Sequence, residues 1–359
     1  MVKIALLTFH NKNNFGAVLQ TYATIKHLQK SNFNVTLIDL IRKPKNRLVS
    51  FIYEKFINYN FWRFRNEHFK NCITKRIYTD ELEKLNFISK EFDSFIVGSD
   101  QVWRKEFTRK FGFLFFLDFI KNKKKISYAS SFGLSEWNDD IERTKKIEGL
   151  LKEFDSISVR ELSGVTICKD SFNVAALKVV DPTLLIPLED YVELANKCKI
   201  KSTNNYIAKF LLDKYSSDQM SLFSELFHRM GKETKDLSIS RVNISNVSLE
   251  VFPNSIEHWL KSLKDSDYIV TESFHCVIFS LIFRKNFICI LNDLRGTARI
   301  ESILNQVGLS HLMIRLDSKT SALDIEQKLK SKIDYDKVWN ILNKEIRFSK
   351  NYLNESLIN

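Results

Sequence analysis

Residues suited to proton transfer and anion binding lie close together in Tyr268–Phe283. A short apolar run ends at Val270, a polar turn follows, and apolar residues then recur at helical spacing, which is typical of a buried strand, a tight turn and a helix. Ligands of open α/β sheets bind where strand carboxyl ends meet helix amino ends, whose N–H groups favour anions. We therefore predict that Ser273 and His275 face an anion site. The alternative is a helix-capping or core-edge histidine.

Two further strand ends carry polar side chains. The predicted strand Ser94–Val97 ends in Gly98-Ser99-Asp100, and Ile157–Glu161 contains Arg160 at its end. Asp100 would orient a hydroxyl or act as a base, with an ordinary helix cap as the alternative. Arg160 would bind an anion through two parallel hydrogen bonds.

The first forty residues form a predicted βαβ unit. A strand over Lys3–Thr8 leads into the polar turn Phe9–Gly16, a helix follows, and Val35–Leu40 returns as a second strand. Asp39 stands at about the distance of a ribose-binding acid, which invites a dinucleotide interpretation. The turn has only Gly16 and lacks Gly-x-Gly-x-x-Gly, so its backbone could not approach a pyrophosphate closely. This argues against a bound NAD.

The composition describes a globular chain with an excess of positive charge. The 359 residues are 44% hydrophobic and 27% charged, with 55 Lys and Arg against 43 Asp and Glu, a net charge of +12. This charge favours an anionic partner, such as nucleic acid, an acidic membrane surface or a phosphorylated substrate. The chain start lacks a signal-peptide layout, no apolar run approaches the roughly 20 residues of a membrane span, and the five cysteines are scattered. We therefore expect a cytoplasmic protein with reduced thiols.

The segment 42–76 departs from the alternating pattern. It contains ten Lys and Arg against two Glu, interleaved with aromatic residues. Such a composition suits an amphipathic helical insertion that lies on an anionic membrane. The alternative, which we favour, is a helical flap whose aromatic side chains pack onto the first domain. The aromatic residues are Phe51, Tyr53, Phe56, Tyr59, Phe61, Trp62, Phe64 and Phe69.

Two alternating series of strands and helices define the expected fold. Residues 1–186 are predicted to form an N-terminal Rossmann-like domain with an insertion at about 42–90, and residues 187–320 a C-terminal Rossmann-like domain. The expected class is α/β, with the two Rossmann-like domains facing across a cleft at their strand ends. Residues 321–359 are predicted to form a helical tail.

A series of short motifs follows in order along the chain. They are Thr8-Phe-His-Asn11, Asn13-Asn-Phe-Gly-Ala-Val-Leu-Gln20, Phe95-Ile-Val-Gly-Ser-Asp-Gln-Val-Trp103, Tyr128-Ala-Ser-Ser-Phe-Gly133, Ser158-Val-Arg-Glu161, Asp181-Pro-Thr-Leu-Leu185, Ser273-Phe-His275 and Arg295-Gly-Thr-Ala-Arg299. Together they resemble the polysaccharide pyruvyl transferase family, with little of the likeness in 42–90 and 320–359. One departure is Cys276, which stands where the family usually has Gly after Ser-Phe-His. Its added side chain would narrow the acceptor pocket.

This resemblance implies transfer of a pyruvyl group from phosphoenolpyruvate to a sugar of a cell-surface polysaccharide or its precursor, commonly as a cyclic ketal. It also implies the fold of B-type glycosyltransferases, without a requirement for a nucleotide-sugar. Protonation of the donor's methylene group makes the adjacent carbon open to attack by a sugar hydroxyl, and phosphate is then lost. Histidine suits this proton transfer, while guanidinium groups and helix amino ends suit the phosphate and carboxylate.

On this basis His275 is assigned to proton transfer, with Asp100 as the second catalytic candidate, and Arg160 to the donor's anionic groups. No carboxylate–histidine cluster has metal-ligand spacing, so we expect no essential metal and no cofactor. The remaining candidates for donor binding are Ser273, Arg295 and Arg299, and those for lining the cleft are Asn13, Asn14, Gly16 and Ser99.

The expected partners are phosphoenolpyruvate and a glycan or lipid-linked glycan, with peripheral contact to an anionic membrane at its inner face and no nucleic acid. Two other classes of function stay open. One is a B-type glycosyltransferase using a nucleotide-sugar, which the same cleft would serve. The other is a non-enzymatic basic protein that binds membrane or nucleic acid, although no nucleic-acid-binding motif is evident.

Overall fold

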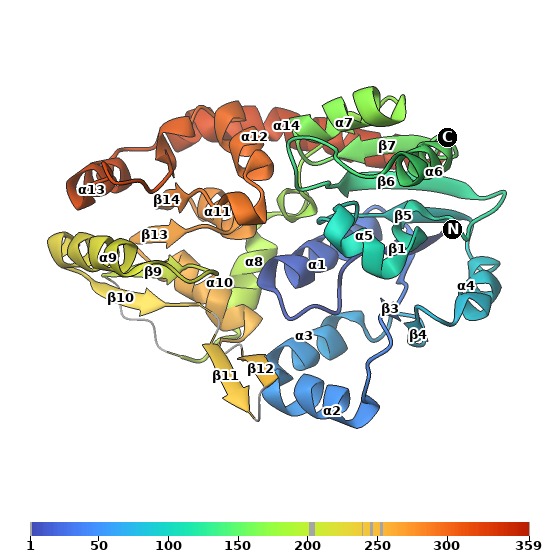
Figure 1. Cartoon of the computed structure of the whole chain (residues 1–359), viewed down its shortest axis with the longest axis horizontal. Coiled ribbons are helices and arrows are strands. Elements are labelled where there is room, and N and C mark those ends of the chain that lie inside the picture. The colour runs from blue at the N-terminus through green and yellow to red at the C-terminus, as the bar shows by residue number, and fades with distance from the viewer. Residues whose placement is uncertain (1, 201–204, 239, 245–246, 252–253, 359) are drawn as a thin grey trace.

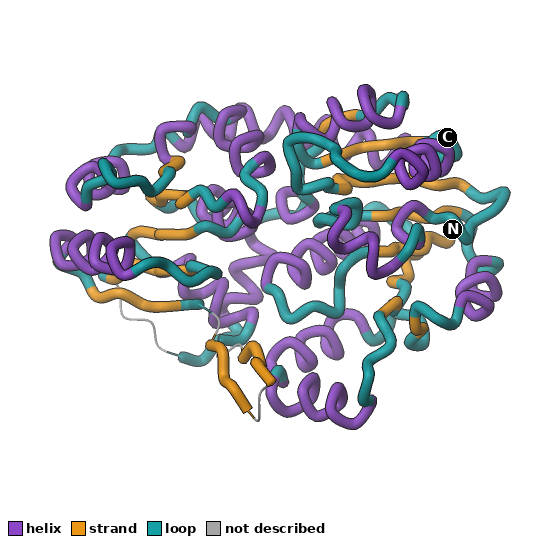
Figure 2. Tube along the Cα trace, in the orientation of Figure 1, coloured by secondary structure: helices purple, strands orange, loops and turns teal. Residues whose placement is uncertain are grey.

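The computed structural model describes residues 2–200, 205–238, 240–244, 247–251 and 254–358. Two β-sheets, each flanked by helices, lie side by side in the molecule (Figures 1 and 2). The described ladders within both sheets are parallel, and parallel strands need crossovers that place helices on the sheet faces. The expected α/β class with two Rossmann-like domains is confirmed.

The first sheet belongs to the N-terminal half. Its strands are β1 (Lys3–Leu7), β2 (Asn34–Leu37), β5 (Ser94–Val97), β6 (Lys124–Ser130), β7 (Ser156–Val159) and β8 (Leu177–Lys178). The helices of this half are α1 (Phe15–Lys30), α5 (Lys105–Phe111), η2 (Leu114–Phe116), α6 (Ile141–Leu151), α7 (Leu162–Phe172) and η3 (Pro182–Leu184). The strand order β2-β1-β5-β6-β7-β8 reverses between β1 and β5, which is the position where open sheets bind ligands.

The second sheet has the strand order β10-β9-β13-β14-β15. These strands are β9 (Tyr206–Phe210), β10 (Glu233–Asp236), β13 (Tyr268–Thr271), β14 (Asn286–Ile290) and β15 (Met313–Ile314), and a separate hairpin joins β11 (Ser240–Ile244) to β12 (Val247–Val251). The helices are α8 (Leu188–Asn196), α9 (Ser217–Met230), α10 (Ile256–Asp265), α11 (Phe274–Ile282), η4 (Asp293–Arg295), α12 (Ala298–Gln306) and η5 (Ser310–Leu312). The predicted strand, turn and helix at Tyr268–Phe283 are confirmed as β13 and α11. The predicted domain boundary at residue 186 lies between the two sheets.

The insertion contains helices with two different environments. Its elements are β3 (Leu40–Ile41), α2 (Arg47–Ile52), the π-helical turn η1 (Tyr53–Ile57), α3 (Tyr59–Phe69), β4 (Ile77–Tyr78) and α4 (Leu82–Ser89). Phe61 and Phe64 of α3 are fully buried, and their rings meet Phe15 and Tyr22 of α1 at centroid distances of 5.1 and 5.8 Å. The packed-flap interpretation is therefore confirmed for α3. Phe56 of η1, in contrast, is 71% exposed.

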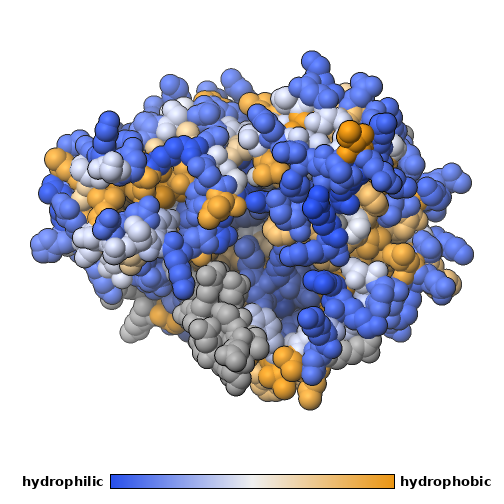
Figure 3. Space-filling model, in the orientation of Figure 1, coloured by the Kyte–Doolittle hydropathy of each residue, from blue (hydrophilic) through white to orange (hydrophobic). Residues whose placement is uncertain are grey.

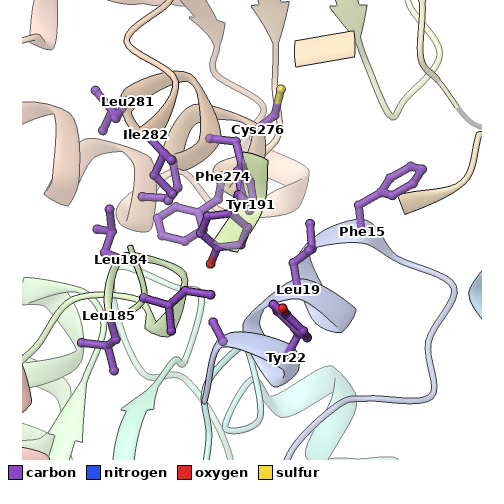
Figure 4. Close-up of a cluster of buried hydrophobic side chains, with 14 of the residues drawn as sticks. Phe15, Leu19, Tyr22, Leu184, Leu185, Tyr191, Phe274, Cys276, Leu281 and Ile282 are labelled. Carbon is purple, nitrogen blue, oxygen red and sulfur yellow. The ribbon is translucent and has the colours of Figure 1, made fainter. Parts of the chain in front are cut away.

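An apolar cluster joins the two domains below the cleft (Figure 4). It brings together side chains of α1, η3, α8 and α11, among them Leu19, Tyr22, Leu184, Leu185, Tyr191, Phe274 and Ile282. The Tyr191 hydroxyl donates to the carbonyl of Thr183 at 2.8 Å, so this buried polar group is satisfied. Because the cluster is continuous, α1 and α11 are fixed against each other, and with them the residues at their amino ends.

The C-terminal tail consists of two helices, α13 (Ala322–Lys330) on the second domain and α14 (Tyr335–Ile358), which contacts both domains. Glu326 of α13 pairs with Arg229 of α9 at 2.8 Å. Tyr352 of α14 donates its hydroxyl hydrogen to the carbonyl of Ser127 in β6 at 3.1 Å. The tail therefore crosses from the second domain back to the first.

Candidate active site

A cavity of about 400 Å³ lies between the domains, at the strand ends of both sheets. Figure 3 shows the surface hollowed between the two halves of the molecule. A larger groove of about 910 Å³ lies between β2, β4 and α4. None of the residues that line it was predicted to be catalytic, to bind the donor or to line the cleft. The candidates that line the interdomain cavity are Asn14, Asp100, Ser273, His275, Arg295 and Arg299.

The amino ends of α1 and α11 meet at Gly16 and His275. A Cβ atom added to Gly16 would lie 2.0 Å from His275 Nδ1 and 2.3 Å from its Cγ. Both residues belong to the first turns of their helices, where N–H groups have no partner within the helix and the dipole is positive. Two positive helix ends therefore converge beside the imidazole of His275.

Asp181 connects His275 to Arg160. Its Oδ2 lies 2.7 Å from Arg160 Nη1 and 3.6 Å from His275 Nε2, and it accepts a hydrogen bond from the Ser99 hydroxyl at 3.3 Å. Burial alone would raise the pKa of Asp181, but the charges of His275 and Arg160 outweigh it and hold this pKa well below its usual range. A buried carboxylate thus orients both residues. Asp181 begins the motif Asp181-Pro-Thr-Leu-Leu185, and its sequence context predicts no role for it.

Replacing Asp181 by Asn should lower the free energy of unfolding by about 3 kcal/mol at neutral pH, because the Arg160 charge would lose a buried partner. Because the pKa of Asp181 is lowered in the folded state, ionised Asp181 stabilises the fold fully above about pH 3.9, the pKa of Asp in the unfolded chain. This stabilisation is lost as the pH falls toward the pKa of Asp181 in the folded state. Urea unfolding at pH 7 measures the difference. Asp80→Asn, which removes a surface pair with Lys43, should cost less than about 1 kcal/mol. Equal losses would contradict the buried role.

Two guanidinium groups lie against the ring of Phe274. The Cζ atoms of Arg160 and Arg299 are 4.5 and 5.6 Å from its centroid. Arg299 lines the cavity and is 7% exposed, and its Nε has no hydrogen-bond partner within the described part of the chain. Burial, and after it repulsion by Arg160, lowers the pKa of Arg299 to about 10. A buried cation in this situation is stabilised by an anion.

Arg160 is held by carboxylates of its own domain. Besides Asp181, its Nη2 lies 3.5 Å from Asp100 Oδ1. Burial would lower the pKa of Arg160, but Asp181 and Asp100 outweigh burial and raise it. Arg160 lies outside the cavity lining, so the arginine placed to meet a ligand directly is Arg299.

Asp100 lies at the edge of the cavity with 14% of its side chain exposed. Burial would raise its pKa, but Arg160 and His275 outweigh this effect and lower it, so Asp100 is a carboxylate at neutral pH. Its Oδ1 accepts the N–H of Gln101 at 2.8 Å. Asp100 and His275 both line the cavity.

Arg295 lines the cavity but is already paired. Its Nε and Nη2 donate to the two oxygens of Asp213 at 2.7 and 2.8 Å. Its carbonyl accepts from Arg104 of the first domain at 3.0 Å and from Arg299 at 3.0 Å. Arg295 therefore contributes to the contact between the domains.

The cleft-lining candidates occupy different positions. Asn14 caps α1 by accepting the N–H of Ala17 at 3.0 Å, and it lines the cavity. Asn13 accepts from Arg65 of the insertion at 3.3 Å, and Ser99 is fully buried against Asp181. Ser273 is the N-cap residue of α11, without a side-chain cap.

One expectation changes with the structure. Cys276 is fully buried in the apolar cluster, outside the cavity lining, so its expected narrowing of the acceptor pocket is wrong for this cavity. Burial raises the pKa of its thiol to about 12. The carboxylate of Asp39 is held by His10 at 2.9 Å and by Arg76 at 3.0 Å.

Within the described ranges, no group of three or more His, Cys, Asp and Glu side chains could hold a metal ion. The expectation that the reaction needs no metal stays a prediction. Among the same residues, no helix combines the length and apolarity needed to cross a bilayer.

Solved structures share this two-domain arrangement. UDP-GlcNAc 2-epimerase from Neisseria meningitidis, bound to UDP-GlcNAc, has a TM-score of 0.58 at 12% identity, with all of both chains covered. A putative UDP-N-acetylglucosamine 2-epimerase from Listeria monocytogenes has a TM-score of 0.57 at 13% identity, over 98% of this chain and 94% of that one. A UGT transferase from Siraitia grosvenorii, in complex with UDP, has a TM-score of 0.52 at 9% identity, with both chains fully covered. At these identities the likeness concerns the fold alone, which is the fold of B-type glycosyltransferases and related epimerases.

The family model of the polysaccharide pyruvyl transferases matches residues 14–293. This range covers most of the chain, including the cavity residues Asp100 and His275, whereas β1, β15 and the cavity residues Arg295 and Arg299 lie outside it. The chain therefore belongs to the polysaccharide pyruvyl transferase family, and the family indicates a transferase. No curated protein matches the sequence.

Proposed function

We propose that this chain transfers a pyruvyl group from phosphoenolpyruvate to a sugar of a cell-surface polysaccharide or its precursor, as a ketal. The observation that carries the proposal is the buried arginine Arg299, which lies against Phe274 and faces the cavity. Phosphoenolpyruvate has a phosphate and a carboxylate, and either would relieve the unfavourable positive charge there. In this proposal the acceptor is a glycan, free or lipid-linked, and transfer takes place in the cytoplasm.

The chemistry needs only proton transfers and a leaving group. His275 would give a proton to the methylene carbon, where the electron pair of the double bond forms the new C–H bond. A sugar hydroxyl then attacks the adjacent cationic carbon while its proton passes to Asp100. The bond between that carbon and the phosphate oxygen breaks, phosphate leaves, and a second hydroxyl of the sugar closes the ketal with loss of its proton. The positive ends of α1 and α11 would stabilise the anionic donor.

The test is release of phosphate from phosphoenolpyruvate by the full chain, with and without a panel of glycans. We expect release that requires both the donor and one of the glycans. Parallel reactions with nucleotide-sugars cover the glycosyltransferase alternative. Consumption of a nucleotide-sugar with phosphoenolpyruvate left intact would overturn the proposal.

Arg299→Lys is expected to raise the KM for phosphoenolpyruvate about tenfold or more, because lysine lacks the planar fork that binds a carboxylate or phosphate through two hydrogen bonds. The turnover number should change much less. Steady-state kinetics with the donor varied measure both constants. Arg315→Lys, in an exposed pair with Asp293 outside the cavity, is the matched control and should behave as wild type. An unchanged donor KM for Arg299→Lys would remove Arg299 from the donor site.

A further inference from the structure

Helix α2 and turn η1 present an apolar surface to solvent. Leu48 is 67% exposed and Phe56 71% exposed. Singly exposed apolar residues are ordinary on protein surfaces, but here they gather within one short stretch. We call this stretch the apolar patch, and it consists of Leu48, Val49, Phe51, Ile52, Phe56 and Tyr59. Figure 3 shows apolar atoms gathered at the lower edge of the molecule, where Figure 1 places α2.

Basic side chains border the apolar patch. Arg42 and Lys45 precede α2 and are exposed, as is Lys43, which pairs with Asp80 at 2.6 Å. Within the patch, the Nζ of Lys55 lies 4.5 Å from the centroid of the Phe51 ring. The border is therefore positive, as the excess of Lys and Arg in 42–76 leads one to expect.

The two carboxylates of the segment 42–76 are both paired. Glu54 accepts from Arg65 at 3.4 Å and from Arg76 at 3.2 Å. Glu67 pairs with Lys197 at 2.9 Å. Neither carboxylate offsets the positive border.

We propose that the apolar patch docks on an anionic lipid bilayer, with its apolar side chains in the interface and its lysines and arginines against the lipid headgroups. An exposed apolar face bordered by Lys and Arg, with aromatic residues in it, is the arrangement that binds such interfaces. A second copy of the chain fits less well, because the same cations would face each other. The positive border also selects against a neutral surface.

The patch is fixed to both domains rather than carried on a free arm. Arg63 of α3 pairs with Glu257 of α10 at 2.7 Å, and Phe61 is fully buried. Arg65 donates to Asn13 in the loop that leads to the cavity. Docking would therefore hold the cavity at a set height above the bilayer. If the proposed function holds, this placement suits an acceptor sugar carried on a lipid.

The experiment measures sedimentation of the full chain with vesicles of phosphatidylcholine alone or mixed with phosphatidylglycerol. We expect binding to the mixed vesicles and release by high salt, which shortens the range of charge attraction to a few ångströms. Phe51→Ser combined with Phe56→Ser should weaken binding at least about tenfold, because two large apolar side chains no longer leave water. Ile141→Ser combined with Leu162→Ser is the matched control, because Ile141 of α6 and Leu162 of α7 are exposed apolar residues outside the patch. It should bind as wild type.

The charge requirement has its own variant. Lys45→Gln combined with Lys55→Gln should lower binding to the mixed vesicles about tenfold or more at low salt. Unchanged thermal unfolding of each variant confirms that the fold is intact. Equal recovery with both kinds of vesicle, or binding that survives Phe51→Ser with Phe56→Ser, would overturn the proposal. A dimer of the wild type in sedimentation velocity that Phe51→Ser with Phe56→Ser converts to a monomer would also overturn the proposal. The patch would then be an interface between two copies of the chain. Vesicle binding requires no turnover, so it is independent of the proposed activity.

Discussion

His275→Gln is expected to lower the turnover number about 100-fold or more, the usual contribution of a general acid or base. Glutamine keeps hydrogen-bonding groups but cannot titrate, so it separates proton transfer from hydrogen bonding. Affinity for phosphoenolpyruvate should change little, because Arg299 and the helix amino ends remain. His275→Ala should behave in the same way.

Calorimetry with phosphoenolpyruvate and phosphate release on the same samples give the two quantities for both variants. His311→Gln, at an exposed histidine outside the cavity, is the control and should match wild type. If the Gln variant of His275 turned over near the wild-type rate, His275 would serve as a cap or hydrogen-bonding group. The proton would then come from another residue, with Asp100 as the next candidate.

Gly16→Ala should also lower turnover about 100-fold, since displacement of a catalytic group by about 1 Å can have that effect. The new Cβ atom would lie 2.0 Å from His275 Nδ1, so the imidazole or one of the two helices has to move. Overpacking of this kind also lowers the free energy of unfolding by about 1–3 kcal/mol. Gly149→Ala is the control, because a Cβ atom at Gly149 meets nothing within 4 Å.

A second variant identifies the collision itself. In the Gly16→Ala/His275→Ala double variant the ring is absent, so most of the stability lost in Gly16→Ala should return. Urea unfolding of the four proteins in this cycle measures the interaction between the two positions. Additive effects on stability would mean that Gly16 and His275 do not press on each other, and the account of the converging helix ends would fail.

Much of the fold was predictable because the chain repeats one local pattern. The apolar run of Tyr268–Val270 and the helical spacing after it define a buried strand and a helix without tertiary information. The same holds for Lys3–Thr8, which corresponds to β1. Sequence position at strand ends was also enough to select Asp100 and His275, which share the cavity.

The interactions around these residues were not predictable, because they depend on packing between distant segments. Asp181 contacts His275 only through the folding of both domains, and its one sequence signal was an Asp-Pro-Thr motif after an apolar pair. The sequence ranked Arg160 above Arg299, because Arg160 ends a predicted strand, but the structure places Arg299 and not Arg160 in the cavity lining. Their difference arises from Asp181 and Asp100, which neutralise Arg160 and leave Arg299 toward the cavity. The divided role of the insertion was likewise hidden, because the exposed Phe51 and Phe56 precede buried phenylalanines such as Phe61 within one continuous aromatic-rich segment.

The most direct test uses phosphoenolpyruvate with an ¹⁸O label in the oxygen that bridges carbon and phosphorus. Pyruvyl transfer breaks the carbon–oxygen bond, so the bridging oxygen stays with phosphorus. Mass spectrometry should therefore find the label in the released phosphate and an unlabelled pyruvyl group on the glycan. The release should require the glycan and be lost in His275→Gln. Unlabelled phosphate would show cleavage of the phosphorus–oxygen bond instead, and it would contradict pyruvyl transfer at this site.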